Sequence, residues 1–202
     1  MRTPRLVVLL VIPLAVSLLT APAQAGFEDP HFIASALWTS PDAVQIQGDR
    51  GYALFLNGLA IYDLGVPESP TLLGRIEMPG FANQGGDGFA VDGSFVYVAR
   101  HEHGLRVVDV SDPAQPREIA GYEFSGCDFW DVDLAGGYAC VTDAGNRRFL
   151  VFDISDPSRP RVTGGVTLPV MPLRVAVDGS HAYVTIGGAG LAIIDIADPG
   201  DP

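Results

Sequence analysis

The chain has 202 residues, a formal net charge of −12 and no lysine. Such an acidic surface repels the phosphates of nucleic acids and of anionic lipids, so the composition argues against nucleic acid as a partner. The same acidity keeps an exported protein soluble, and it can attract cations or basic protein patches.

Residues 1–25 have the pattern of a secretory signal peptide. Two arginines precede an apolar run from Leu6 to Leu19, and the small residues Ala23-Gln24-Ala25 form a cleavage site. The apolar run is interrupted by Pro13 and is shorter than the ~20 residues that a spanning helix needs. No later segment could span a membrane. We therefore predict an exported protein that is secreted, periplasmic or at the cell surface.

Residues 26–202 are predicted to form one domain of four repeats. A turn glycine recurs at Gly48, Gly93, Gly136 and Gly179, with spacings of 45, 43 and 43 residues. An apolar strand precedes each glycine and a second one follows it. A third strand ends in aspartate, and a fourth begins after a proline that follows a turn. Four short strands in ~40–50 residues are typical of a β-propeller blade, so the predicted fold class is all-β.

The repeats cover about residues 43–78, 88–124, 131–168 and 174–202. The first strands are predicted at 44–46, 89–91, 132–134 and 175–177; the second at 51–55, 96–99, 139–142 and 182–185; the third at 59–63, 105–109, 150–153 and 191–195; and the fourth at 70–78, 116–124 and 160–168.

The fourth repeat ends before its own fourth strand. The segment Pro30–Trp38, near the start of the chain, has the fourth-strand pattern instead. We predict that strand 31–38 lies beside strand 191–196 and closes a ring of four blades. The alternative is a truncated part of a larger propeller.

These repeats have the residues of a known family. Residues 175–185, followed by 190–199, resemble the LVIVD repeat of bacterial and archaeal extracytoplasmic proteins, and residues 88–116 and 132–160 match equally well. The first copy departs most, because Val66-Pro67 stands in place of Ser-Asp-Pro. The resemblance implies a β-propeller at the cell surface or in the periplasm, with binding or adhesion as the usual function. It supplies no catalytic residues.

In a propeller, the loops before the first strand and between the second and third strands open on one face around the central channel. Polar and aromatic groups from different repeats converge there, which makes it the default binding site. The residues predicted on this face, called here the channel-mouth residues, are Asp87, Arg100, His101, Glu102, His103, Asp128, Trp130, Asp131, Asp143, Arg148 and Arg174.

Two features of this face carry the chemical hypotheses. The imidazoles of His101 and His103 could hold one divalent cation, with Asp87 or Asp128 completing the site; the plainer interpretation is a solvated polar loop. Trp130 is either a stacking platform for a sugar or peptide or a core side chain between blades.

The chain has no phosphate-binding loop with lysine and no Gly-x-Ser-x-Gly elbow. We therefore expect a non-enzymatic binding module for a protein or a surface polymer. The alternative is a metal-dependent enzyme or metal-binding site at the channel mouth, using His101 and His103. The oligomeric state is left open.

The two cysteines, Cys127 and Cys140, invite a disulfide in an exported protein. With Gly136-Gly137 as the turn, residue 140 faces about residue 133, and Cys127 lies some six residues further along at ~3.3 Å per residue. That separation is too long for a bridge unless the loop folds back, so we expect free thiols.

Overall fold

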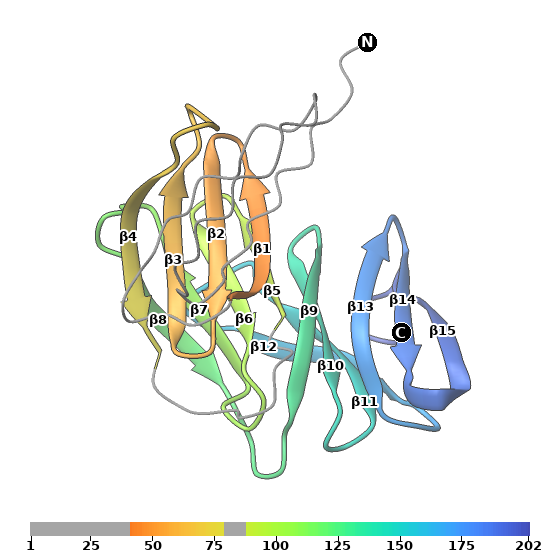
Figure 1. Cartoon of the computed structure of the whole chain (residues 1–202). Helices are drawn as coiled ribbons and strands as arrows, with labels where there is room; N and C mark the ends of the chain where they lie inside the picture. Colours follow the sequence, from red (N-terminus) through yellow and green to blue (C-terminus); the bar gives the residue numbers. More distant parts are fainter. Residues whose placement is uncertain (1–40, 79–87) are drawn as a thin grey trace, which may run out of the picture.

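The structure is a computed structural model that describes residues 41–78 and 88–202. Within these residues the regular elements are strands and one short 3-10 turn, Gly187–Ala189 (Figure 1). The strands are β1 (Pro41–Gln47), β2 (Arg50–Phe55), β3 (Gly58–Asp63) and β4 (Thr71–Glu77); β5 (Phe89–Asp92), β6 (Phe95–Ala99), β7 (Leu105–Asp109) and β8 (Arg117–Tyr122); β9 (Phe129–Ala135), β10 (Tyr138–Asp143), β11 (Arg148–Asp153) and β12 (Arg161–Thr167); and β13 (Pro172–Asp178), β14 (His181–Ile186) and β15 (Gly190–Asp195).

These strands form four antiparallel sheets, each from consecutive strands, in the arrangement of a four-bladed β-propeller. The first three blades have four strands, and the described part of the fourth blade has three. The first strands of neighbouring blades contact one another in chain order, β1 with β5, β5 with β9 and β9 with β13, so they are the inner strands. The predicted fold class is confirmed, and every strand predicted within residues 41–202 is present.

The core lies between the blades. Tyr97 and Val107 of the second blade pack against Val141 and Phe152 of the third. Because a strand directs successive side chains to opposite faces, a central strand covered on both faces is apolar throughout. Strand β6 shows this pattern, with four of its five residues buried.

A repeated aspartate turn ends each third strand. The carboxylates of Asp63, Asp109, Asp153 and Asp195 accept the N–H of the residue two positions later, at 2.8–2.9 Å. This local hydrogen bond ends the strand pairing and starts the turn, a role that aspartate side chains commonly have. In the divergent first copy the next turn keeps its backbone bond, from Ser69 N–H to the carbonyl of Val66 at 2.9 Å, without the usual aspartate.

The pairing of β9 with β10 has the register from which we predicted that Cys127 and Cys140 form no disulfide. Cys140 lies opposite Asp133 in the ladder, as the position of the glycine turn predicts. Both Cys127 and Cys140 are buried free thiols.

Three sequence predictions fall outside the described residues. They are the signal peptide at 1–25, the closing strand at 31–38 and the site residue Asp87. In the part of the chain that the structure describes, no helix is long and apolar enough to cross a membrane.

Candidate functional site

Four of the channel-mouth residues lie at one end of the inner strands. Trp130 and Asp131 are at the start of β9, Arg174 is near the start of β13, and Asp128 immediately precedes β9. The remaining described members lie at or between the ends of second and third strands: Arg100, His101, Glu102, His103, Asp143 and Arg148.

Three of these residues form one contact unit, called here the His101–Asp128–Trp130 unit. His101 Nδ1 lies 2.7 Å from one carboxylate oxygen of Asp128, and the indole N–H of Trp130 donates to the other at 2.9 Å. The rings of His101 and Trp130 meet edge to face, with centroids 5.3 Å apart. Both oxygens of Asp128 are therefore engaged, and the indole is held in one orientation.

The backbone explains why these side chains meet. His101 N–H donates to the carbonyl of Phe129 at 2.8 Å, and Phe129 N–H donates to the carbonyl of His101 at 3.0 Å. This bridge joins the β6–β7 loop of the second blade to the inner strand of the third. His101 adopts a φ of +47°, a region that costs energy for a side chain with a Cβ, so the contact holds a strained turn.

Asp143 is the fully buried centre of a second cluster. It accepts the backbone N–H of Asp128 at 3.2 Å, the amide of Asn146 at 3.0 Å and the guanidinium of Arg148 at 2.9 Å. The Arg148 guanidinium also lies 4.9 Å from the ring of Phe124. A buried carboxylate needs such partners to offset its loss of hydration. Because Asp143 is held by Arg148 and accepts the N–H of Asp128, the two residues position the loop that carries Asp128.

Two further channel-mouth residues join neighbouring blades. Arg100 is 3% exposed, and its guanidinium donates to the carbonyl of Leu56 in the first blade at 3.3 Å. Asp131 accepts the N–H of Val175 on β13 at 2.9 Å. Burial raises the pKa of the Asp131 carboxyl, although Val175 and the guanidinium of Arg174 act in the opposite direction.

Glu102, His103 and Arg174 are the most exposed described members of the set. His103 Nε2 lies 3.9 Å from Glu102 Oε1, and their side chains are 36% and 62% exposed. Arg174 is 51% exposed and its Nη1 lies 3.9 Å from Asp131 Oδ1. These groups are available to solvent, whereas Arg100 and Asp143 are buried.

The metal hypothesis gains no support from the described residues. Among 41–78 and 88–202, no three His, Cys, Asp or Glu side chains are grouped as metal ligands. His101 is buried with its Nδ1 on Asp128, while His103 is at the surface beside Glu102, so the His-x-His pair does not converge. Asp87, the other proposed ligand, is outside the described residues.

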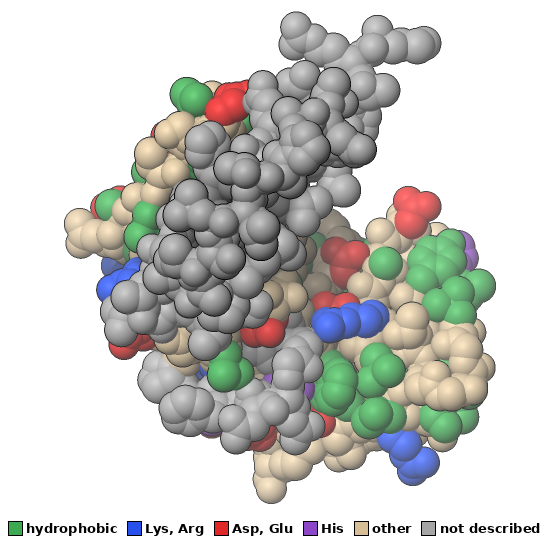
Figure 2. Space-filling view, in the orientation of Figure 1, with side chains coloured by type: hydrophobic (Ala, Val, Ile, Leu, Met, Phe, Trp, Pro, Cys, Tyr) green, Lys and Arg blue, Asp and Glu red, His purple; other side chains and the backbone are tan. Residues whose placement is uncertain are grey.

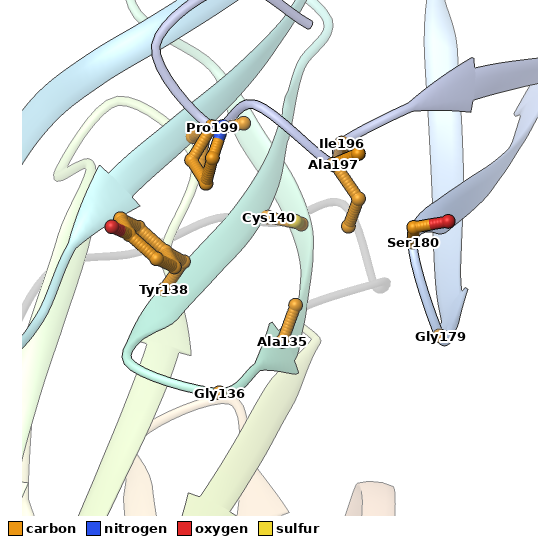
Figure 3. Close-up of a pocket in the computed structure, with 10 residues that line it drawn as sticks. Ala135, Gly136, Tyr138, Cys140, Gly179, Ser180, Ile196, Ala197 and Pro199 are labelled. Carbon is orange, nitrogen blue, oxygen red and sulfur yellow. The ribbon is translucent and has the colours of Figure 1, made fainter.

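A cavity of about 330 Å³ lies between the third and fourth blades, at the opposite end of β9 from Trp130. Its lining is largely apolar and includes Cys140, Ser180 and Ile196 (Figure 3). Burial raises the pKa of the Cys140 thiol to about 12, so the thiol stays protonated at neutral pH. A protonated buried thiol is a poor nucleophile, which argues against cysteine chemistry there.

The comparison with known families settles the resemblance. The LVIVD repeat matches residues 87–123, 126–167 and 173–202, which together make up more than half of the chain. The chain belongs to the LVIVD repeat family. The divergent first copy, at 43–78, is outside these matches yet forms the same four-stranded blade.

Solved structures share the fold of this LVIVD protein. A protein from Lactobacillus plantarum has a TM-score of 0.66 at 18% identity over 79% of this chain and 52% of its own length. A functionally unknown protein from Desulfotomaculum acetoxidans has 0.66 at 16% over 85% and 56%. The computationally designed Ika4 protein has 0.58 at 9% over 78% and 91%. The chain thus spans about half the length of the two bacterial proteins, and these identities establish the fold alone. The comparison with curated proteins found no match.

Sequence reasoning missed the side chains that join inner strands of the LVIVD blades. Asp133 accepts the N–H of Val177 at 2.7 Å, and Gln45 donates to the carbonyl of Phe89 at 2.6 Å. In each case the partners are 44 residues apart, about one repeat. Polar residues on otherwise apolar inner strands, combined with that spacing, are the signal that could have identified them.

Proposed function

We propose that this LVIVD-repeat protein is an exported binding module, without catalytic activity, that holds a protein or a surface polymer at its channel mouth. The observation that carries the proposal is the His101–Asp128–Trp130 unit. It presents a half-buried indole whose orientation is determined by one hydrogen bond and one ring contact.

A prepositioned aromatic ring suits binding. An aromatic side chain offers a large apolar surface, and immobilising it on binding costs conformational entropy. Asp128 and His101 have already restricted the rotation of the indole, so less entropy remains to be lost. The unit is in turn held by Asp143, which accepts the backbone N–H of Asp128.

The neighbouring blade adds polar contacts. Arg174, on the inner strand next to Trp130, is 51% exposed and lies near Asp131. A guanidinium provides several hydrogen-bond donors in a planar array, which suits hydroxyl or carbonyl acceptors of a sugar or peptide. The surrounding carboxylates of Asp128 and Asp131 favour neutral or basic ligands over anionic ones.

The proposal is tested by calorimetric titration with defined probes, namely neutral hexasaccharides of glucose and of N-acetylglucosamine, and a basic extended hexapeptide. We expect saturable binding of at least one probe. Trp130→Ala should weaken it about tenfold or more, since the lost ring contact is worth on the order of 1.4 kcal/mol. Arg174→Ala should weaken it several-fold.

Arg117→Ala is the matched control, because Arg117 is 73% exposed on the outer strand β8, away from the channel mouth. Circular dichroism checks that each variant is folded. Binding that is equally weakened by the Arg117 change, or unaffected by the Trp130 change, would place the ligand elsewhere. If no probe binds, the proposal fails for these ligand classes.

A further inference from the structure

One position of the second strand, called here the tyrosine position, differs in the third blade. It lies four residues after the turn glycine. Three of the repeats have a tyrosine there, namely Tyr52, Tyr97 and Tyr183. The third repeat has Cys140. The third blade therefore lacks an aromatic ring that the other three have.

The residue before the turn glycine differs in the same blade. The other repeats have a longer polar side chain at this place, namely Gln47, Asp92 and Asp178. The third repeat has Ala135. Two neighbouring positions of one blade thus have smaller side chains than their counterparts.

At the first two blade interfaces the tyrosine ring is part of the core. Tyr52 is buried in the cluster between the first and second blades, together with Val110, and Tyr97 is buried between the second and third, together with Ile154. Val110 and Ile154 are structurally equivalent, because each donates its N–H to the carbonyl of the residue after the turn glycine of its own blade, at 2.8–2.9 Å. Ile196 makes the same bond in the fourth blade, at 2.8 Å.

The cavity of about 330 Å³ lies at the corresponding place between the third and fourth blades. Its lining includes Cys140 and Ala135 of the third blade and Ile196 of the fourth (Figure 3). The turn between β9 and β10 and the turn between β13 and β14 contribute Gly136 and Gly179, and both turns lie at the same end of their blades (Figure 1). The cavity thus includes the space that a tyrosine ring fills at the other two interfaces.

Tyr138 does not replace this ring. It lines the cavity two residues before Cys140, and it is partly buried against the same cluster. The second blade has Phe95 at the equivalent position, and Phe95 packs against the cluster that contains Tyr97. An aromatic ring at this position therefore accompanies the ring at the tyrosine position and does not substitute for it.

We propose that this cavity binds a small, neutral, single-ring aromatic molecule of the phenol class, whose ring takes the place of the absent tyrosine side chain. A dry cavity of roughly 150 Å³ with aliphatic and aromatic walls is enough to hold benzene, so this volume admits one ring with a small substituent. Figure 2 shows hydrophobic side chains gathered on the surface over the fourth sheet, which forms one wall of the cavity. The site lies at the opposite end of β9 from the channel mouth and is independent of it.

The charges around the cavity select against an anionic ring. Asp133 lies directly opposite Cys140 in the ladder, and its carboxylate accepts the N–H of Val177 on the fourth blade, so it is on the cavity side of the sheet. A second carboxylate there would be both desolvated and repelled. At the equivalent interface, burial and the Asp92 carboxylate raise the pKa of Tyr97 to about 12, so that ring is a neutral phenol at pH 7.

The test is a titration of the folded, unaltered protein with 4-methylphenol, which is the tyrosine side chain as a free molecule. Methyl NMR of labelled isoleucines locates the probe. We expect a saturable shift of the Ile196 methyl signals with a Kd of about 1 mM or tighter. Ile154, at the interface that Tyr97 already fills, is the internal control and should not shift. The anionic analogue 4-methylbenzoate should bind at least about tenfold more weakly.

Two variants at one position complete the test. Cys140→Tyr restores the ring covalently and should abolish the Ile196 response, whereas Cys140→Ala leaves the space open and should bind within about threefold of the unaltered protein. Circular dichroism checks that each variant is folded. If Cys140→Tyr does not fold, the contrast between Ile196 and Ile154 in the unaltered protein decides.

Three results would overturn the proposal. The first is the absence of a saturable Ile196 shift in the folded, unaltered protein up to the solubility limit of the probe. The second is a folded Cys140→Tyr protein that binds the probe as tightly as before. The third is a response of the Trp130 indole signal alone, which would place the probe at the channel mouth. Equal binding of 4-methylbenzoate would overturn the selection for a neutral ring.

Discussion

At the scale of single residues, the aspartate at the end of each third strand does more than accept one N–H. Asp109 also receives the guanidinium of Arg117 at 2.9 Å, and Asp153 receives that of Arg161 at 3.2 Å. Each arginine follows the proline that starts the outer strand, so the pair joins both ends of the turn. Bonds from Ser111 and Arg117 lower the pKa of Asp109 to about 2.

That shift makes a prediction about acid stability. A carboxyl with a lowered pKa contributes stability that is complete above its unfolded pKa of about 4 and is lost as the pH falls towards 2. Asp109→Asn keeps an acceptor for Ser111 but removes the charge. We expect it to destabilise the fold by about 1 kcal/mol at pH 7, with the difference vanishing between pH 4 and pH 2.

Urea unfolding at pH 7, 4 and 2 measures this difference. Asp49→Asn, at an exposed turn, is the matched control and should follow the unaltered protein throughout. A difference that is constant with pH would show that the charge of Asp109 is not responsible.

The residues of the candidate site also show the limit of prediction from sequence. Placing His101, Asp128 and Trp130 at one end of the blades needed only the repeat, because equivalent loops must open on the same face. Their mutual contacts could not be predicted from the sequence. His101 and Asp128 are 27 residues apart, and they meet because His101 adopts a left-handed backbone conformation and forms a backbone bridge to Phe129. The burial of Arg100 and Asp143 was missed for the same reason.

At the scale of elements, the outer strands pack on the turns of the following blades. A Cβ at Gly164 of β12 would overlap the backbone of Pro199 and crowd Pro202. Backbone atoms cannot move aside as a flexible side chain can, so overpacking there costs more than a rotamer change.

We therefore expect Gly164→Val to destabilise the fold by about 2 kcal/mol, within the usual 1–3 kcal/mol range for overpacking. Thermal unfolding followed by circular dichroism measures the loss. Gly137→Ala is the control, because a Cβ there meets no atom within 4 Å. Equal melting temperatures for the Gly164 variant and the unaltered protein would contradict the packing argument.

At the scale of the whole molecule, the large excess of acidic over basic residues affects the stability of the fold. Arg2 and Arg5 are in the predicted signal peptide, so residues 26–202 carry 10 arginines against 24 acidic residues, a formal charge of −14. Repulsion among like charges destabilises a compact state, and salt screens it within a Debye length of ~8–10 Å near physiological ionic strength.

We expect the melting temperature at pH 7 to rise by a few degrees between about 10 and 150 mM monovalent salt, through this screening. Sodium and choline chloride should act equally, since screening does not depend on the cation's size or ligands. A large rise caused by micromolar divalent metal alone, reversed by chelator, would contradict this account and would revive the His101–His103 metal hypothesis.

The whole-molecule architecture was the part most open to prediction. Four copies of a strand pattern, with turn glycines at regular spacing, are enough to indicate blades, because each copy is a local unit. How neighbouring blades meet was not predictable, since it depends on single side chains such as Gln45 and Asp133 that do not recur in every repeat.

Those joints between inner strands have a consequence for how such rings change size. The first and second blades are joined by a glutamine side chain, the second and third by a direct backbone bond from Gly88 to Trp130 at 3.0 Å, and the third and fourth by two aspartates. No shared ladder crosses from one blade to the next among these contacts. Adding or removing a blade would therefore break no shared ladder, and what would have to be rebuilt is the apolar core on its two faces together with these joints.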